Sequence, residues 1–314
     1  HTLRRGFLSS HQLEKIVGHY VSQGLLRRES LSILRAVCVF AKRKFKYGAR
    51  IWDSVARELR WMMSLLPTME VDISKPWSEK VWVFDASEWG EGIMFSYHPA
   101  HTVQEVGGFN ERWRFKHGEP PARALAHRQI MDTLIFQQDN EKLHEYLSNL
   151  EAKQHDPSKS QRRFARATAS VGNHIDTTHH VPCVPACIVT SKWVEASSKP
   201  WKRREHISVL ETRASVGTAR FICSDVKLHN KHNLVLSDSM AQLLGAGKGR
   251  SSAPGMCRAL RQLAAVILVA NVTLHGRWVP SEVNPADHPS RRGLEKRRSC
   301  AAPARPLARS GPAF

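Results

Sequence analysis

The chain has 314 residues, of which 41% are hydrophobic, so it can bury a core and is not a wholly disordered polypeptide. Its 47 basic residues exceed its 28 acidic ones, and most of the net charge of +19 lies at the two ends. Residues 1–60 carry +9 and residues 291–314 carry +6, which leaves +4 between them. Basic flanks around a nearly neutral centre indicate a protein that binds a polyanion, most simply nucleic acid. For residues 291–314 alone, a disordered tail without a specific ligand is an equal alternative.

Six cysteines are scattered through the chain, and those at positions 38, 223 and 257 lie in apolar or helical contexts. This pattern favours buried thiols in a reducing compartment over a disulfide framework. No apolar run approaches the roughly 20 residues of a membrane span, and no signal peptide is visible. We therefore expect an intracellular protein, cytoplasmic or nuclear, with no membrane partner. Because the sequence begins with His1 close to a helical pattern, we also expect a fragment of a longer product.

Residues 1–76 are predicted to form a small helical region. Apolar positions at helical spacing indicate three helices: one capped by Ser10, one marked by Leu31, Leu34 and Val37, and one over residues 52–66 that stops at Pro67. The second helix ends in the basic run of residues 42–46, which the helix dipole favours and which could contact a phosphate backbone. A solvated basic helix end is an equal alternative.

The sequence KVWVFDASEWGEG at residues 80–92 is the segment around which the rest of the chain is organised. Its β-branched and aromatic residues predict a buried strand that ends on Asp85, followed by a small, glycine-containing turn into a second strand at residues 93–97. A carboxylate at the end of a core strand is costly to bury alone, so it should meet a cation or a metal. A further antiparallel strand is expected within residues 103–115, from the apolar positions Val103, Val106, Phe109, Trp113 and Phe115.

Residues 116–190 differ from their surroundings and are interpreted as an insertion, partly disordered, with a charged helical piece at residues 123–150. Within it, HHVPCVPAC at residues 179–187 resembles a zinc-ligand cluster by composition. Because that segment contains two prolines and no second pair of ligands, a proline-rich loop is the preferred interpretation.

The remaining elements alternate along the chain. They are a strand at 192–196, a helix at 206–221, a strand at 233–237, a short helix from Ser239, a helix at 254–271, a strand at 272–279 and a final short helix opened by residues 284–287. Strands that first form a meander and then alternate with helices predict an α/β fold, with a mixed sheet covered by helices.

Four acidic residues fall at the ends of core elements in this layout: Asp85, Glu211, Asp238 and Asp287. Asp238 follows a strand at the kind of strand-to-helix switch where α/β sheets bind ligands. Glu211 shares a helix face with Ile207 and Ala214, so it should point toward the sheet. Hard oxygen ligands at one sheet edge make a magnesium site, and two ions about 4 Å apart can activate a water and stabilise the leaving oxygen of a phosphodiester.

Each acid, taken singly, also has a plain structural alternative. Asp85 could form a turn, Glu211 could be a partly exposed helix residue, Asp238 could cap a helix, and Asp287 could be a first-turn acid favoured by the helix dipole.

Four segments that contain these acids resemble the ribonuclease H domain of retroelement reverse transcriptases, most closely the DIRS-like group. They are DASEWGEG at 85–92, HISVLE at 206–211, LSDS at 236–239 and WVPSEVNPADHPSR at 278–291. The NPADxPSR part of the last segment is the most specific. The resemblance covers about residues 77–115 and 190–292, and residues 10–76 are more weakly similar to the helical thumb and connection region that precedes this domain.

The resemblance implies a ribonuclease H-like fold, a five-stranded mixed sheet with flanking helices. The implied domains are a helical region at 1–76, the ribonuclease H-like domain at 77–292 with the insertion at 116–190, and a basic, disordered tail at 293–314. The implied activity is hydrolysis of the RNA strand of RNA–DNA hybrids. Asp85, Glu211, Asp238 and Asp287 would be the catalytic ligands of two Mg²⁺ ions, with Mn²⁺ as an alternative ion.

The implied partners are an RNA–DNA hybrid and the rest of a retroelement polyprotein, with a polymerase region upstream. Arg203, Arg204, Lys248 and Arg250 would contact phosphates, with solvated charge as the alternative. Several features depart from the family pattern: Ser239 replaces the usual Asn after the third acid, residues 280–283 lack the His that many members carry, and the insertion at 116–190 is large for this fold. Two other functions stay open, a catalytically inactive reverse-transcriptase fragment that only binds nucleic acid and a different nuclease on the same fold.

Overall fold

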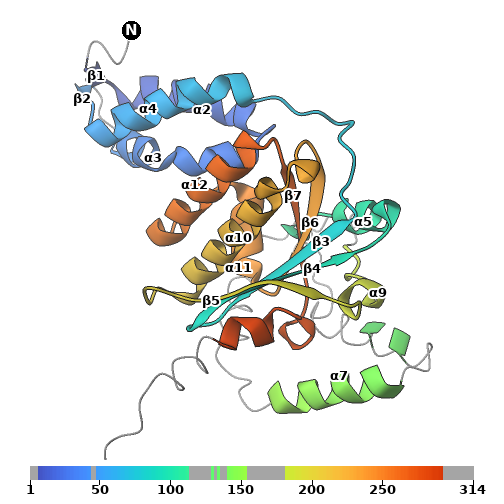
Figure 1. Ribbon diagram of the computed structural model, residues 1–314. Helices are drawn as coiled ribbons and strands as arrows, with labels where there is room; N and C mark the ends of the chain where they lie inside the picture. Colours follow the sequence, from blue (N-terminus) through green and yellow to red (C-terminus); the bar gives the residue numbers. More distant parts are fainter. Residues whose placement is uncertain are drawn as a thin grey trace, which may run out of the picture.

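A computed structural model describes residues 6–43, 47–112, 129–130, 133–134, 140–153 and 181–292. Its centre is a five-stranded mixed sheet with the strand order β5-β4-β3-β6-β7 (Figure 1). The strands are β3 (Lys80–Ala86), β4 (Gly90–Tyr97), β5 (Val194–Pro200), β6 (His232–Ser237) and β7 (Thr273–Trp278). The neighbours β3, β4 and β5 run antiparallel, whereas β6 runs parallel to both β3 and β7. The predicted α/β layout with a mixed sheet is therefore confirmed.

Helices cover both faces of the sheet. On one face lie α10 (Ile207–Ser224), α11 (Met240–Lys248) and α12 (Pro254–Val269), and on the other lie the short helices α5 (Ala100–Gly107) and α9 (Ala186–Val189) (Figure 1). Alternation along β3 separates the two cores: Trp82 and Phe84 pack with α10 and α12, whereas Val81 and Val83 pack with α5 and α9. Helix α7 (Asn140–Lys153) lies beside the 3₁₀ turn η5 (Ser281–Val283).

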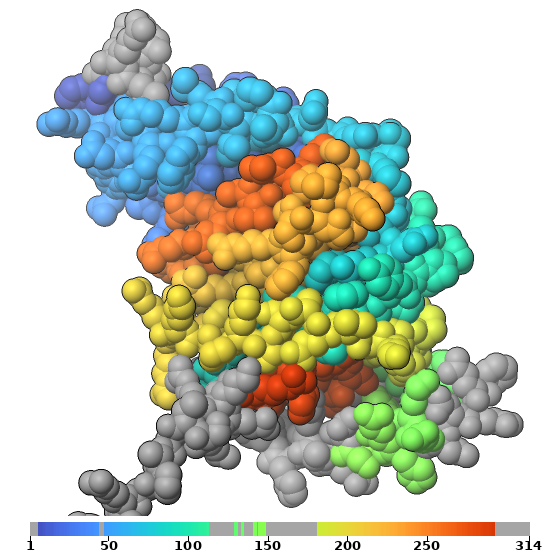
Figure 2. Space-filling view, in the orientation of Figure 1, coloured from blue at the N-terminus to red at the C-terminus, as the bar shows by residue number. Residues whose placement is uncertain are grey.

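The N-terminal residues form a helical region with its own apolar core, built around Leu13, Val37, Phe40 and Val55. Its elements are β1 (Phe7–Leu8), α2 (Ser10–Gly24), the 3₁₀ helix η1 (Arg28–Ile33), α3 (Arg35–Lys42), β2 (Ala49–Arg50), α4 (Asp53–Leu65) and the 3₁₀ turn η2 (Leu66–Thr68). In Figure 2 this region (blue) is stacked directly on α11 and α12 (orange), with β5 (yellow) and the last described residues (red) beyond them.

Polar contacts hold the helical region against the sheet region. The buried Arg27 donates from Nη1 to Asn271 Oδ1 at 2.9 Å, and Lys75 Nζ donates to the backbone oxygen of Asn271 at 2.9 Å. Gly249 ends α11 in the left-handed conformation, with φ at 66°, and an added Cβ would lie 1.6 Å from the carbonyl oxygen of Arg28. Only glycine satisfies both conditions, so this close approach depends on residue 249.

Three expectations about elements are corrected. The strand expected within residues 103–115 is instead helix α5, because Val103 and Val106 are three residues apart and bury one helical face; residues 113–115 lie outside the described residues. The third antiparallel strand is β5, from after the insertion. The second expected helix is divided into η1 and α3 at Leu34, whose φ and ψ of −81° and 44° are not helical.

The first helix is capped by Ser9 rather than Ser10. Ser9 Oγ accepts from the Gln12 backbone N–H at 3.2 Å, and Gln12 Oε1 accepts from the Ser9 N–H at 3.1 Å, which is a capping box. Outside the insertion, the other expected helices and strands are present with ends shifted by a few residues. Of the helical piece expected at 123–150, the structure describes α7 and, before it, only residues 129–130 and 133–134. No helix of the described ranges is both long and apolar enough to cross a bilayer.

Several expectations concern residues that the structure does not describe. The basic run at 42–46 is described only as far as Arg43, and the tail at 293–314 lies wholly outside the described residues. His179 and His180 of the candidate zinc segment also lie outside, while the described residues 181–185 form no helix or strand before α9. Cys38, Cys223 and Cys257 are buried or half-buried thiols, as their apolar contexts predicted.

Candidate metal centre

Two carboxylates meet at the carboxyl ends of the parallel strands β3 and β6. Asp85 is the penultimate residue of β3, and Asp238 directly follows β6. The register of the two strands sets Val83 opposite Leu236. Two residues further along, Asp85 and Asp238 come level with each other, which is why residues more than 150 positions apart share one site.

The third carboxylate comes from helix α10. His206 caps this helix, since its Nδ1 accepts from the Ser208 N–H, and Glu211 lies one turn into it. Glu211 is only 7% exposed and faces the sheet with its neighbours Leu210 and Ala214. The alternative of a partly exposed helix residue therefore does not describe Glu211.

Asp85, Glu211 and Asp238 form a carboxylate triad. One carboxylate oxygen of each lies within 4.8 Å of the others, and the triad is the one group in the described ranges that has the composition and spacing to hold a metal ion. Glu211 Oε2 and Asp238 Oδ1 are enclosed and accept no hydrogen bond. Asp238 does not cap α11, whose N-cap is Ser239 without a side-chain bond. Enclosed carboxylate oxygens without donors are suited to a cation.

Burial and mutual repulsion disfavour the charged forms of the triad. Burial, then the charges of Asp238 and Asp85, raise the pKa of Glu211 to about 10. Burial, then the charges of Asp85 and Asp287, raise the pKa of Asp238 to about 8. Burial also raises the pKa of Asp85. A divalent cation would supply the missing positive charge and favour the ionised forms.

Asp287 lies beside the triad without belonging to it. It begins the last described helix, residues 287–292, and its charge contributes to the raised pKa values of Asp85 and Asp238. Its Oδ1 accepts from Arg291 Nη2 at 2.7 Å, one helical turn away. The role of Asp287 as a fourth ligand stays a prediction.

Two residues outside the predicted set of acids make hydrogen bonds that hold the triad in place. Ser290 is fully buried, and its hydroxyl lies 2.6 Å from Asp85 Oδ2, to which it can donate. Asn284 lowers the pKa of Asp238 through a side-chain hydrogen bond and donates to the carbonyl oxygen of Phe84 at 3.3 Å. Both belong to the NPADHPSR segment, so their signal was proximity to Asp287 within one motif.

Glycine in β4 lets this C-terminal segment lie against the sheet. A Cβ on Gly92 would lie 2.3 Å from the carbonyl oxygen of Ala286 and 2.7 Å from the Ser290 nitrogen. Ser198 Oγ on β5 and Ser87 Oγ donate to the carbonyl oxygens of Pro289 and Ser290, each at 2.7 Å. The glycines of the turn sequence thus permit a close backbone approach as well as the turn itself.

The four basic residues expected to contact phosphates occupy two different places. Arg203 and Arg204 are exposed in the loop before α10, and the Arg204 guanidinium lies 5.6 Å from the Trp89 ring centroid at the β3–β4 turn. Lys248 and Arg250 are exposed at the end of α11 opposite Asp238, about 15 Å along the helix axis. Their contact with phosphates stays a prediction, and only Arg203 and Arg204 lie in the loop that leads into the start of α10, the helix of Glu211.

Neither the protein-family models, nor the curated proteins, nor the solved structures compared with this chain gave a match.

Proposed function

We propose that this protein is a metal-dependent ribonuclease of the ribonuclease H type, which hydrolyses the RNA strand of RNA–DNA hybrids. The observation that carries the proposal is the triad of Asp85, Glu211 and Asp238, whose oxygens lie within 4.8 Å of one another. Burying three acids with no cation nearby is unfavourable, so a fold that assembles them has a use for a cation. Magnesium, which prefers carboxylate oxygens, is the proposed ion, with manganese as an alternative.

The sheet supports the finer fold assignment. In chain order its strands read 3-2-1-4-5 across the sheet, with an antiparallel meander of three followed by two parallel strands. This order is consistent with the ribonuclease H-like fold, a five-stranded mixed sheet with flanking helices, which the resemblance of residues 85–92, 206–211, 236–239 and 278–291 implies. We propose on the same grounds that the chain derives from a retroelement reverse transcriptase of the DIRS-like group. Several phosphodiester chemistries occur on one such fold, so the substrate must be tested directly.

The residues of the site fit a divalent cation. Glu211 Oε2 and Asp238 Oδ1 are enclosed acceptors without donors, and Asp85 offers the third carboxylate. Asp287, from the following helix, is the proposed fourth ligand. When bound, magnesium supplies Lewis-acid activation of a water and neutralises charge on the phosphate. Ser290 and Asn284 position Asp85 and Asp238 through the hydrogen bonds they make to these acids.

Basic and aromatic residues near the triad suit a hybrid duplex. The loop at residues 202–204, Lys-Arg-Arg, is exposed, and Arg204 lies over the ring of Trp89. Trp201 fixes this loop to the β3–β4 turn, since its Nε1 donates to the Ser87 carbonyl at 2.9 Å. A-form-like duplexes are recognised by shape, phosphates and 2′-hydroxyls, so little sequence preference is expected.

The test is cleavage of an RNA–DNA hybrid labelled on the RNA strand, with Mg²⁺ and with EDTA. Asp85→Asn should abolish cleavage while hybrid binding is retained. Glu88→Gln is the matched control, since Glu88 is an exposed acid three residues along the same segment and should leave cleavage unchanged. Duplex DNA and single-stranded RNA test the substrate assignment.

Two results would contradict the proposal. Hybrid binding without cleavage in Mg²⁺ or Mn²⁺ would identify a module that only binds nucleic acid. Equal cleavage of duplex DNA and hybrid would keep the metal site but assign a different nuclease.

A further inference from the structure

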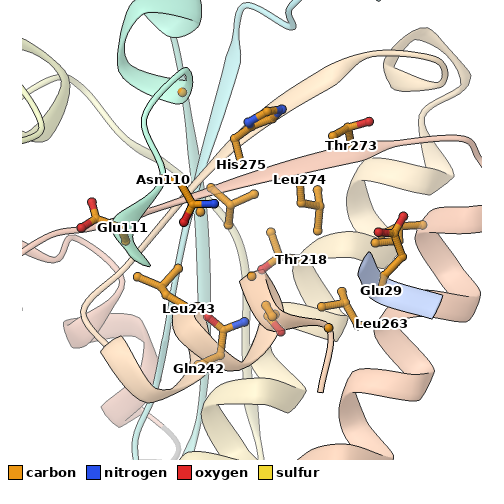
Figure 3. A pocket seen from close by; sticks show the side chains of 18 of the residues that line it. Glu29, Asn110, Glu111, Thr218, Gln242, Leu243, Leu263, Thr273, Leu274 and His275 are labelled. Carbon is orange, nitrogen blue, oxygen red and sulfur yellow. The ribbon is translucent and has the colours of Figure 1, made fainter. Parts of the chain in front are cut away.

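A partly open cavity lies on the α10 face of the sheet, apart from the triad. The cavity has a volume of about 330 Å³ and is bounded by β3, β6 and β7, by α10, α11 and α12, and by the loop after α5 (Figure 3). An engineered apolar cavity of about 150 Å³ is enough to bind benzene. The space is therefore large enough for a bicyclic aromatic molecule.

Most of the cavity wall is apolar. Phe84 and Val235 line it from the sheet, Leu260 and Leu263 from α12, and Leu243 from α11. All five side chains are buried, and all except Leu243 belong to the apolar core on this face of the sheet. An apolar wall of this kind gives water few partners, so an apolar ligand gains by replacing water there.

Polar side chains also line the cavity, among them Asn110, Thr218 and Thr273, and Gln242 is the one with an unpaired acceptor. It is 2% exposed, and its Oε1 is enclosed without a hydrogen-bond partner. In Figure 3 its side chain extends from α11 among the lining residues Leu243 and Thr218. The hydroxyl of Thr218 already donates to the Ala214 carbonyl at 3.0 Å, so Gln242 offers an acceptor that the wall does not satisfy. A buried acceptor left unpaired is costly, which favours a ligand that donates to it.

The cavity has an opening between α11 and the loop after α5. Among its lining residues, Gly108, Phe109, Asn110 and Gly247 are exposed. An added Cβ on Gly247 would meet nothing within 4 Å, so the α11 side of this opening is not obstructed by packing. A ligand can therefore enter without separating the helices from the sheet.

We propose that this cavity is a binding site for a neutral bicyclic aromatic molecule that carries one N–H or O–H donor, with Gln242 as its hydrogen-bond acceptor. The aromatic part fills the apolar space beside Phe84 and Leu263, and the donor pairs with Gln242 Oε1. This site is independent of the proposed nuclease activity, because it shares no residue with the triad.

The position of the cavity gives such a ligand access to the elements that carry the triad. Phe84 directly precedes Asp85, and Ser215 follows Glu211 by one turn of α10. Gln242 follows Asp238 by four residues at the start of α11. A ligand therefore packs against all three elements from behind the carboxylates.

The test is a ¹⁹F NMR titration of the whole chain with 5-fluoroindole and with 5-fluoro-1-methylindole, which lacks the donor. We expect saturable binding of 5-fluoroindole with a Kd on the order of 0.1 mM. It should bind about fivefold more tightly than the methylated probe, because only it donates to Gln242.

Three variants distinguish binding in the cavity from binding elsewhere on the protein. Gln242→Leu should bind both probes equally, whereas Gln262→Leu, the same change at an exposed position on α12, should keep the fivefold preference. Ala246→Leu adds volume inside the cavity and should weaken both probes at least tenfold. The absence of saturable binding, or binding that Ala246→Leu and Gln242→Leu leave unchanged, would overturn the proposal.

Discussion

At the scale of single residues, Asp238 and Glu211 are the two acids whose charged forms the triad disfavours most, and Asp238 offers the direct test. Its Oδ1 is enclosed and unpaired, and burial with the neighbouring charges raises its pKa to about 8. Without a metal, Asp238→Asn should therefore raise the free energy of unfolding at pH 9, by on the order of 2 kcal/mol. Urea denaturation in EDTA measures this difference.

The same variant should respond less to metal. If the triad binds Mg²⁺ as proposed, the ion should stabilise the folded parent, and that stabilisation should shrink in Asp238→Asn because one proposed ligand is lost. Glu14→Gln, at an exposed site on α2, is the control and should leave both quantities unchanged. If Asp238→Asn were less stable than the parent in EDTA at pH 9, the charge of Asp238 would not be unfavourable.

Residue types and positions were enough to predict the acids of the site. Asp85 and Asp238 follow apolar strands, and Glu211 shares a face with apolar residues, so local patterns identify them. Ser290 could not be found in this way, because a serine on a short helix is ordinary until its hydroxyl is seen 2.6 Å from Asp85. Its role depends on the approach of residues 286–290 to Gly92, a tertiary contact that its place in the NPADHPSR segment does not reveal.

At the scale of elements, two glycines at the end of α11 make a matched pair. Gly249 has φ at 66°, and its Cβ would collide with the Arg28 carbonyl, whereas Gly247 faces open space. Gly249→Ala should lower the free energy of unfolding by about 2 kcal/mol or more, because the backbone is strained and η1 must move. Gly247→Ala should raise it by about 0.5–1 kcal/mol, since alanine favours a helix.

Urea denaturation of both variants measures whether their free energies of unfolding change in opposite directions. If the two substitutions had similar effects, the close contact between η1 and α11 would not exist in solution. The contact joins the helical region to the sheet region, so its loss should also separate their unfolding transitions.

A buried ion pair fixes the segments on either side of the insertion to β7. Arg277 is fully buried and donates from Nε to Glu111 Oε1 at 2.8 Å, and also donates to the carbonyl oxygens of Val106 and Pro182. Arg277→Met should cost about 3–5 kcal/mol, because it leaves the carboxylate of Glu111 buried without its cation. Adding Glu111→Gln should recover part of that loss.

A double-mutant cycle by urea denaturation measures the coupling between Arg277 and Glu111. Additive effects of the two substitutions would contradict a direct pair. Neither residue was predicted, because Glu111 lies 166 positions from Arg277 and sits in a segment that we expected to be a strand.

Helices and strands were predictable where the spacing of apolar residues matched only one of them. They were not predictable where the spacing fitted both a helix and a strand. Strand β3 and helices α10 and α12 follow from their patterns. Val103 and Val106 were assigned to a strand with the aromatic residues after them, yet a spacing of three is helical, and helix α5 packs Gly107 against Trp77. The 3₁₀ helix η1 was expected to be part of one helix with α3, and it contacts α12 and α11, which are distant in sequence and give no local pattern.

At the scale of the whole molecule, buried titratable groups give the metal-free protein two opposing pH trends. The raised pKa values of Glu211 and Asp238 mean that the folded state holds protons that the unfolded state has lost above about pH 4. Stability from these groups therefore falls as pH rises from about 4 toward 8–10. His275 acts oppositely: burial, then the charge of His232, lowers its pKa to about 4.

His275 stays neutral in the folded state at pH values where the histidine of the unfolded state already binds a proton. In that pH range the extra proton favours the unfolded state. Stability from His275 is therefore lost as pH falls from 6.5 toward 4. Above pH 7 the effect of His275 on stability no longer changes with pH, and only that of Glu211 and Asp238 still does. We expect the free energy of unfolding in EDTA to decline from pH 7 to pH 9, and saturating Mg²⁺ to remove most of that decline. Urea midpoints across this range measure both, and a flat profile in EDTA would contradict the raised pKa values.

The fold class was predictable from the order of elements, but the relation of the helical region to the sheet was not. Apolar faces predicted helices within residues 10–66 and a mixed sheet after them. Their docking depends on single polar contacts such as Arg27 with Asn271, 244 positions apart, which no periodicity encodes. The cavity likewise depends on how six elements leave a space between them, a property of packing alone.

The contact between Ser290 and Asp85 spans 205 positions, and this separation has a consequence for the order of events in folding. The β3–β4 hairpin can form locally, whereas closing a chain of that length is entropically slow and requires most of the sheet to be in place. We therefore expect the carboxylates to stay apart and hydrated until β6 pairs with β3, which sets Asp85 level with Asp238, and Ser290 to join Asp85 only after that. Tight capture of a divalent ion would then be a property of the assembled sheet and would distinguish it from earlier folding intermediates.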